Sequence, residues 1–192
     1  MAFPSKTSPE AIRAAAIELL EREGEAALTL RRIAKELGVV PNALYRYFDS
    51  REGLIGAIAD EAATRLLAAI RLEQQRLEAS GPVSAEERCR AHMKAYIAFS
   101  EAHPSLYQTL MTNLRAAEPD ALHPVGHEGL WRSAIETLEP LTGPETAPLA
   151  AVTLWSLLHG MWALRRANLL GGMKPEDFGG YAIETMLRGV RS

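Results

Sequence analysis

The chain has 192 residues, of which 47% are hydrophobic and 23% charged, values typical of a globular protein with one or two domains. Its formal charge of −3 excludes a polycation that binds nucleic acid through charge spread over the whole chain. Charged residues interrupt the long apolar runs, so we expect neither a signal peptide nor a membrane span. The single cysteine, Cys89, excludes an intramolecular disulfide and a multi-cysteine zinc site, and we expect a cytoplasmic location.

The first 80 residues show the apolar spacing of helices. Ser8-Pro9-Glu10 combines an N-cap residue, a proline at the first helical position and an acid in the first turn. Apolar residues then recur at helical spacing until Gly24, which ends the helix. A second helix is predicted over residues 29–37, a third over 41–48 and a fourth over 50–79.

The rest of the chain also reads as helices. Ser80-Gly81-Pro82 is the clearest break, and Ser84 with Glu87 forms a capping-box pattern that opens a helix ending before His103. Further helices are predicted over 106–114, 130–139, 148–170 and 175–188, separated by a loop at 116–125, by Pro140 and by Gly171-Gly172. The predicted fold is all-α with about nine helices, divided into an N-terminal domain over 1–52 and a C-terminal domain over 53–192.

Residues 29–51 have the pattern of a helix-turn-helix. Ala34 is small where the two helices would cross, and Gly38 lies at the turn, where a positive φ is often needed. Apolar residues between Ile33 and Phe48 would form a small core that fixes the angle of the second helix. The remaining outward side chains are the predicted DNA contacts: Thr29, Arg31, Arg32, Lys35, Pro41, Asn42, Ala43, Tyr45, Arg46, Tyr47 and Arg51.

The charge of this segment suits DNA. Residues 27–51 hold five basic and two acidic side chains, a local charge of +3 within an acidic protein. Cations beside phosphates release counterions, which gives an affinity with a steep salt dependence. Hydroxyl groups of Thr29, Tyr45 and Tyr47 can donate to phosphates, whereas Asn42 and Arg46 are suited to bases. Alternatively, these cations only solvate one face of an all-α core.

The segments TLRRIAKELGV (29–39) and ALYRYFDSREGL (43–54) closely resemble the DNA-binding domain of the tetracycline-repressor (TetR) family. The specific part is Leu-Tyr-x-x-Phe followed by Ser-Arg-Glu-x-Leu, and the resemblance covers about residues 8–58. The weaker pattern Trp155-x-x-x-His159-Gly160 resembles a subset of these regulators with a Trp-His-Gly signature. Val40 departs from the family, which usually has a capping Ser or Thr there, and Asn42 lies where a Gly is often found.

This resemblance implies a regulator of transcription that binds a near-palindromic operator as a homodimer and is released by a small apolar effector. Two-fold symmetry doubles the bases that one short helix can read. The dimer would form through the last two helices, whose apolar residues cover more surface than one side can bury. The alternative is a core within one chain. The predicted dimer residues are Val152, Trp162, Phe178, Tyr181, Thr185 and Met186.

The remaining helices would surround an effector cavity. Flexible thioethers and aromatic side chains suit a drug-sized apolar ligand, although at helical spacing such residues are also ordinary core. The predicted effector contacts are Met93, Tyr96, Phe99, Tyr107, Met111, Trp131, Trp155 and His159. No cofactor or metal is predicted.

Two other functions remain open. A metal-dependent enzyme would use His123 and His127, four residues apart beside Glu128, but Pro124 and Gly126 predict a loop in which the histidines cannot share a helix face. The apolar surroundings of Cys89 predict an unreactive thiol. A sensor or adaptor that binds a small molecule without binding DNA is the second alternative.

Overall fold

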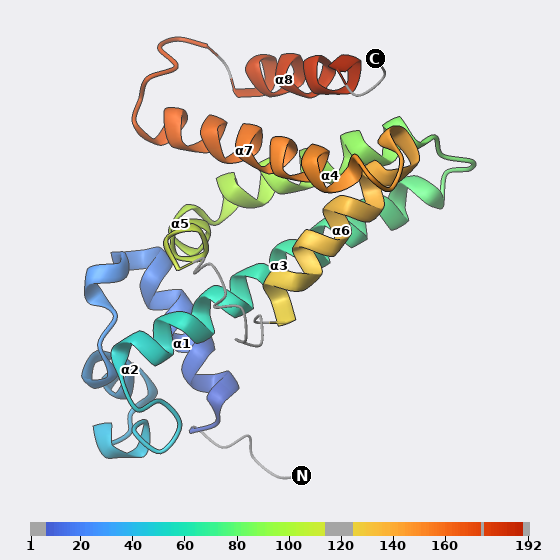
Figure 1. Ribbon diagram of the computed structural model, residues 1–192. Helices are drawn as coiled ribbons and strands as arrows, with labels where there is room; N and C mark the ends of the chain where they lie inside the picture. Colours follow the sequence, from blue (N-terminus) through green and yellow to red (C-terminus); the bar gives the residue numbers. More distant parts are fainter. Residues whose placement is uncertain (1–6, 114–124, 174, 190–192) are drawn as a thin grey trace. The chain divides into compact units, whose positions relative to one another are not determined.

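The computed structural model describes residues 7–113, 125–173 and 175–189 and shows helices throughout (Figure 1). No strand occurs in these ranges, which confirms the predicted all-α fold class. The α-helices are α1 (Pro9–Glu23), α2 (Leu30–Leu37), α3 (Arg51–Glu78), α4 (Ala85–Ala102), α5 (Pro104–Thr112), α6 (Val125–Thr142), α7 (Ala147–Arg166) and α8 (Pro175–Gly189). Two short 3₁₀ helices, η1 (Glu25–Ala27) and η2 (Pro41–Ala43), flank α2.

The helices form two compact units. The described parts of 1–63 and 103–126 make up the first unit, and those of 64–102 and 127–192 make up the second. The long helix α3 contributes to both, because the division falls after Ala63. The helix α5 belongs with the N-terminal helices, an association that its position in the sequence does not indicate.

The first unit is built on α1. The Ser8 side chain accepts a hydrogen bond from the Ala11 N–H at 3.1 Å, and Pro9 occupies the first turn, as the sequence predicts. Gly24 ends the helix with a φ of 80° and donates its N–H to the Leu20 carbonyl at 2.8 Å. The apolar face of α1 is buried in this unit through Ile12, Ala16, Ile17, Leu19 and Leu20.

Glu21 joins α1 to the start of α5. His103, the N-cap residue of α5, makes no side-chain cap hydrogen bond. Instead, the Glu21 carboxylate accepts the N–H of Leu106 at 2.9 Å and that of Ser105 at 3.4 Å. A carboxylate from another helix therefore satisfies amide groups that would otherwise lack a partner, and its charge is favourable at a helix N-terminus.

We expect Glu21→Ala to lower the free energy of unfolding by about 1 kcal/mol, the usual cost of losing a helix cap. Glu21→Gln keeps one acceptor oxygen and should recover part of that loss. Urea unfolding of both variants measures the effect, with Glu18→Ala as the control because Glu18 is exposed on the same helix. Equal losses for Glu21→Ala and Glu18→Ala would contradict the capping role.

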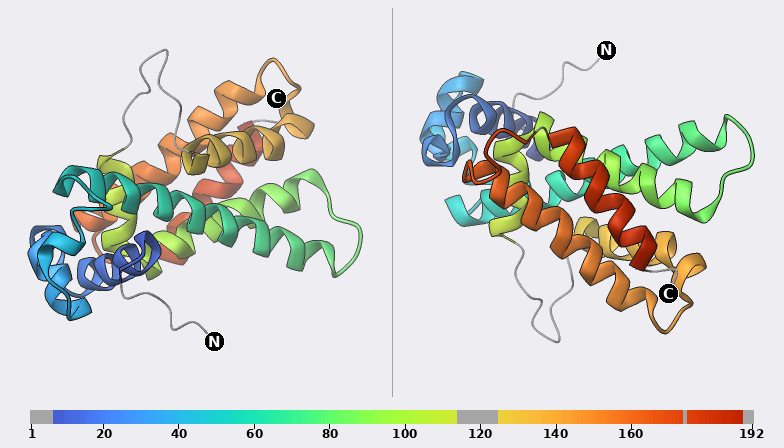
Figure 2. Two further views of the ribbon diagram at one scale, coloured as in Figure 1. Left: turned by 90° about the horizontal axis from the view of Figure 1, so that it is seen from below. Right: turned by 90° about the horizontal axis from the view of Figure 1, so that it is seen from above.

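In the second unit, α4 packs against α7 and α8, and the last two helices lie side by side (Figure 2). The predicted capping box opens α4: the Glu87 N–H donates to Ser84 Oγ at 3.2 Å, and the Ser84 N–H donates to Glu87 Oε2 at 2.9 Å. α8 packs closely at Gly179: a Cβ there would lie 3.5 Å from Ile97 and 3.6 Å from Met161, which are ordinary van der Waals distances.

Three predicted boundaries were wrong. α6 begins at Val125 and continues through Pro140 to Thr142, because a proline in the last turn removes only one amide donor while Gly143, at a φ of 77°, ends the helix. α7 ends at Arg166, four residues before the predicted end, since Asn168 adopts a φ of 55°. The predicted loop at 116–125 lies outside the described residues except for Val125.

Candidate nucleic-acid interface

The helix α2 has one buried face and one exposed face. Thr29 is its N-cap: the hydroxyl oxygen accepts the Arg32 N–H at 3.1 Å, which leaves the hydroxyl hydrogen available to a phosphate. Leu30, Ile33 and Ala34 are buried, whereas Arg31 and Lys35 are exposed one helical turn apart. α2 therefore presents two cations to solvent while its apolar side packs against the rest of the first unit.

Gly38 turns the chain out of α2 toward the reading segment, residues 41–48. Its φ of 67° lies in the left-handed region, as the sequence predicts for this position. The N–H of Gly38 donates to the Lys35 carbonyl at 3.1 Å, and the N–H of Val39 donates to the Ala34 carbonyl at 2.9 Å. These two hydrogen bonds close the turn and fix the direction in which the chain continues.

The predicted third helix is shorter and tighter than expected. The reading segment begins with η2 and continues as consecutive turns to Tyr47, so it is not a regular α-helix. Its first hydrogen bonds span three residues, such as that from the Leu44 N–H to the Pro41 carbonyl at 2.9 Å, which is the pattern of a 3₁₀ helix. Val40 provides no side-chain cap. The Phe48 N–H donates to the Leu44 carbonyl, a single α-type bond.

Buried Leu44 and Phe48 anchor this reading segment. Because these apolar side chains face the core, the polar ones between them face solvent. The predicted DNA contacts Asn42, Tyr45, Arg46 and Tyr47 are exposed, and Pro41 and Ala43 are half-buried. The segment thus offers an amide, two phenols and a guanidinium on one short stretch of chain.

The predicted cations divide into two groups. Within the described residues, Arg31, Lys35 and Arg46 make no ion pair, and all three are exposed. Arg32 and Arg51 instead bind groups of the protein itself. α2 and the reading segment therefore hold three cations that have no carboxylate partner in the described part of the chain, and these three can meet phosphates.

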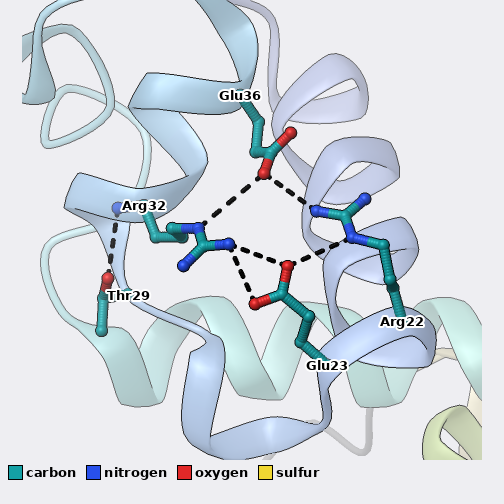
Figure 3. Close-up of polar contacts among 5 residues, drawn as sticks. All are labelled: Arg22, Glu23, Thr29, Arg32 and Glu36. Atoms are coloured by element: carbon teal, nitrogen blue, oxygen red, sulfur yellow. Dashed lines mark hydrogen bonds and ion pairs between the residues drawn. The ribbon is translucent and has the colours of Figure 1, made fainter.

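Arg32 belongs to a charge ring, which we define as Arg22, Glu23, Arg32 and Glu36 (Figure 3). Its Nη2 donates to both carboxylate oxygens of Glu23, at 2.8 and 2.9 Å, and its Nε lies 3.8 Å from Glu36 Oε1. Arg22 closes the ring through Nη2 to Glu36 Oε1 at 2.9 Å and Nε to Glu23 Oε1 at 3.1 Å. The hydrogen bond to Glu23 raises the pKa of Arg22.

Arg51 ties the start of α3 to the loop before α2. Its Nε donates to the Leu28 carbonyl at 2.8 Å and its Nη2 to the Glu25 carbonyl at 2.9 Å, while the Glu25 carboxylate lies 3.6 Å away. The guanidinium is therefore committed to backbone acceptors that the loop leaves open. The sequence gives no signal for this role, because the two carbonyl groups lie more than 20 residues earlier.

The predicted effector contacts come from both units. Tyr107 and Met111 belong to the first unit, and the others belong to the second. Met93, Tyr96, Phe99 and Tyr107 are buried, and Met111 and His159 are half-buried. Trp131 and Trp155 are each 39% exposed, so these two point outward and do not belong to the buried apolar interior.

The predicted dimer residues also divide. Val152, Tyr181 and Thr185 are exposed on α7 and α8, and Trp162 and Phe178 are half-buried. Met186 is buried within the second unit, a correction that places it in the core of a single chain.

α7 is the one described helix whose length and composition could cross a membrane, with 33% of that stretch buried. One such helix is weak evidence for a membrane, and a partner protein can cover the same apolar surface.

A buried polar cluster in the second unit was missed by the sequence analysis. His92 Nδ1 lies 3.1 Å from Thr137 Oγ1, and Gln74 Nε2 donates to the same oxygen at 3.3 Å. Because the Thr137 hydroxyl donates to the Ser133 carbonyl at 2.7 Å, its oxygen is the acceptor and the His92 proton lies on Nδ1. Burial lowers the pKa of His92 to about 4, so the ring is neutral at pH 7.

Cys89 and the two histidines considered for a metal-dependent enzyme lie outside the predicted DNA-binding surface. Burial raises the pKa of Cys89 to about 11, which favours the unreactive thiol, as the sequence predicts. His123 lies outside the described residues, and nothing is described of the His127 side chain. Among the described residues, no three His, Cys, Asp or Glu side chains are placed to hold a metal ion.

A capped helix, a glycine turn and a short exposed segment define a protein of the helix-turn-helix class. A family model for bacterial regulatory proteins of the tetR family matches residues 12–58. A second model, for a tetracyclin repressor-like C-terminal domain, matches residues 89–189, more than half of the chain. The chain belongs to the TetR family of bacterial transcriptional regulators, which confirms the resemblance found in the sequence.

Individual relatives agree with this assignment. An uncharacterized HTH-type transcriptional regulator of Mycobacterium tuberculosis is 28% identical over 172 residues, which cover 88% of this chain and 75% of the relative. A Rhodococcus sp. RHA1 protein of unknown function aligns over 100% of both chains with 28% identity and a TM-score of 0.77. The fold is also that of a TetR protein from Acinetobacter baumannii in complex with minocycline, at 20% identity, a TM-score of 0.67 and coverages of 96% and 98%.

Proposed function

We propose that this transcriptional regulator binds DNA through Arg31, Lys35 and Arg46, with Asn42 and Arg46 reading bases. The observation that carries the proposal is that these three exposed cations have no ion-pair partner in the described residues. Unpaired cations can release counterions from DNA at no cost in broken ion pairs. Thr29, Tyr45 and Tyr47 would add hydrogen bonds to phosphates, and residues 1–52 would form the DNA-binding domain.

We further propose a homodimer that forms through the exposed face of α7 and α8. Val152, Trp155 and Tyr181 are large apolar or aromatic side chains that are exposed in the single chain. Gly160 also lies on α7, and a Cβ added there would have no atom within 4 Å, so a helix of a second chain can approach closely at this point. The dimer would place two DNA-binding domains on the two halves of a near-palindromic operator.

Residues 53–192 would then carry both the dimer surface and the site for a small apolar effector. Ligand-responsive repression is typical of this family. The buried Met93, Tyr96 and Phe99 are the candidates for effector contacts in the second unit. We also propose that the chain belongs to the Trp-His-Gly subset, because Trp155, His159 and Gly160 lie close together along α7. We propose a cytoplasmic location, because bacterial DNA is found there.

A salt series tests DNA binding without knowledge of the operator. The logarithm of the affinity for a random-sequence duplex should fall linearly with the logarithm of the salt concentration. In the triple variant Arg31→Gln/Lys35→Gln/Arg46→Gln, the slope should decrease by about 0.9 for each phosphate that the protein no longer neutralises. A wild-type protein without salt-dependent binding would support the alternative, a sensor that does not bind DNA.

A further inference from the structure

Arg31 and Arg32 are neighbours in α2 but have different surroundings. Arg31 lies one turn before Lys35, and this pair is exposed and makes no ion pair among the described residues. Arg32 lies one turn before Glu36, and this second pair is engaged with Arg22 and Glu23 in the charge ring (Figure 3). One face of α2 is thus open to an external anion, and the adjacent face is occupied by α1.

The ring is a balanced cluster of charges. It contains two guanidinium groups and two carboxylates, and each guanidinium contacts both carboxylates. Both oxygens of Glu23 accept from the same Arg32 nitrogen, Nη2, in charge-assisted hydrogen bonds. Since Arg22 and Glu23 are the last two residues of α1, the ring joins the end of α1 to one turn of α2, from Arg32 to Glu36.

Moving Arg32 to a phosphate would break this balance. Glu23 would lose its two shortest hydrogen bonds, and its carboxylate would face the same phosphate backbone that attracted Arg32. The negative charges of the Glu23 carboxylate and the phosphate repel each other. The energy gained from one phosphate contact is therefore offset by the loss of the ion pairs in the charge ring. Arg31 has no such competing partner among the described residues and is exposed on the neighbouring face.

We propose that Arg32 is a positioning residue that holds α2 against α1 through the charge ring and does not contact the phosphate backbone. This role rests on the proposed DNA binding, because the position of α2 determines where Arg31 and Lys35 lie. It also divides the basic residues of this segment into those that bind DNA and those that orient the binding surface.

The test compares two double variants that each remove one arginine and one glutamate. Arg32→Gln/Glu23→Gln removes one guanidinium and one carboxylate of the charge ring. Arg31→Gln/Glu18→Gln removes an exposed cation of α2 together with an exposed carboxylate of α1. Both leave the net charge unchanged. Binding of a random-sequence duplex is measured across a salt series for these variants and for the wild-type protein.

For Arg32→Gln/Glu23→Gln, we expect the plot of the logarithm of affinity against the logarithm of salt concentration to keep the wild-type slope. The affinity itself should be about two- to fivefold lower, which corresponds to the energy of an exposed ion pair. The Arg31→Gln/Glu18→Gln line should be shallower by about two, one phosphate for each protomer of the dimer. A slope decrease of the same size in both double variants overturns the role proposed for Arg32 and leaves DNA binding intact. Absence of wild-type binding overturns both proposals.

Urea unfolding provides a readout that does not depend on DNA. In Arg32→Gln, Glu23→Gln and their double variant, the loss in the unfolding midpoint should be smaller for the double variant than the sum of the two single losses. Additive losses would show that Arg32 and Glu23 do not act together, and would overturn the positioning role even if the salt slope is retained.

Discussion

Val152→Asp should separate the proposed dimer into monomers and raise its dissociation constant by at least about 100-fold. Val152 is 47% exposed on α7 in the single chain and is one of the residues of the proposed interface. Two-fold symmetry would place two new carboxylates in that interface, and each would lose water without gaining a partner. Sedimentation or light scattering at micromolar concentration should then show the 21.0 kDa mass of one chain.

Leu72→Asp is the matched control for this variant. Leu72 is 48% exposed on α3, so it also places a carboxylate at a half-exposed apolar position on a helix, but outside the proposed interface. It should keep the dimer mass. A dimer that withstands Val152→Asp, or that Leu72→Asp disrupts equally, would contradict the interface. Because one short reading segment contacts few bases, the monomeric variant should also lose preference for its operator.

Acid should destabilise the second unit through His92. The pKa of this side chain is lowered to about 4 by burial, whereas that of histidine in an unfolded chain is about 6.5. Above about pH 6.5 the ring is neutral in both states, and the contribution of His92 is complete. Between about pH 6.5 and 4 the unfolded chain takes up a proton that the folded chain does not, so the free energy of unfolding falls by about 3 kcal/mol.

Chemical unfolding at pH 7 and at pH 4 measures this effect as a difference between proteins, because carboxylates also titrate in acid. His92→Asn keeps a donor toward Thr137 but cannot take up the proton, so its stability gap to the wild-type protein should narrow by about 3 kcal/mol on acidification. A constant gap for His92→Asn would contradict a buried neutral imidazole.

The sequence predicts most helices of this fold because their signals are local. Ser8, Thr29 and Ser84 cap helices within three residues of themselves, and Gly24 and Gly38 end helices at positive φ. The α-helix predicted over the reading segment was wrong, because apolar spacing shows which side chains are buried and not how tightly the backbone turns. Leu44 and Phe48 are buried in a 3₁₀ helix and turns as they would be in an α-helix.

The candidate site was predicted in composition but not in its pairing. A count of charges over residues 27–51 treats Arg32 and Arg51 as available, but Glu23 and Glu25, which bind them, lie outside that range. Only the one-turn spacing of Arg32 and Glu36 could have indicated the charge ring from sequence. Glu21 and Arg51 bind backbone groups far along the chain, contacts that exist only once the helices pack.

Selection of bound sequences from a random DNA pool is the measurement that most directly tests whether two copies of this surface read one duplex. We expect enrichment of an inverted repeat, with both half-sites on the same side of the duplex, and loss of the preferred bases within each half-site in Arg46→Ala. No enrichment from the pool, or enrichment of a single unrepeated site that Arg46→Ala binds equally well, would contradict it.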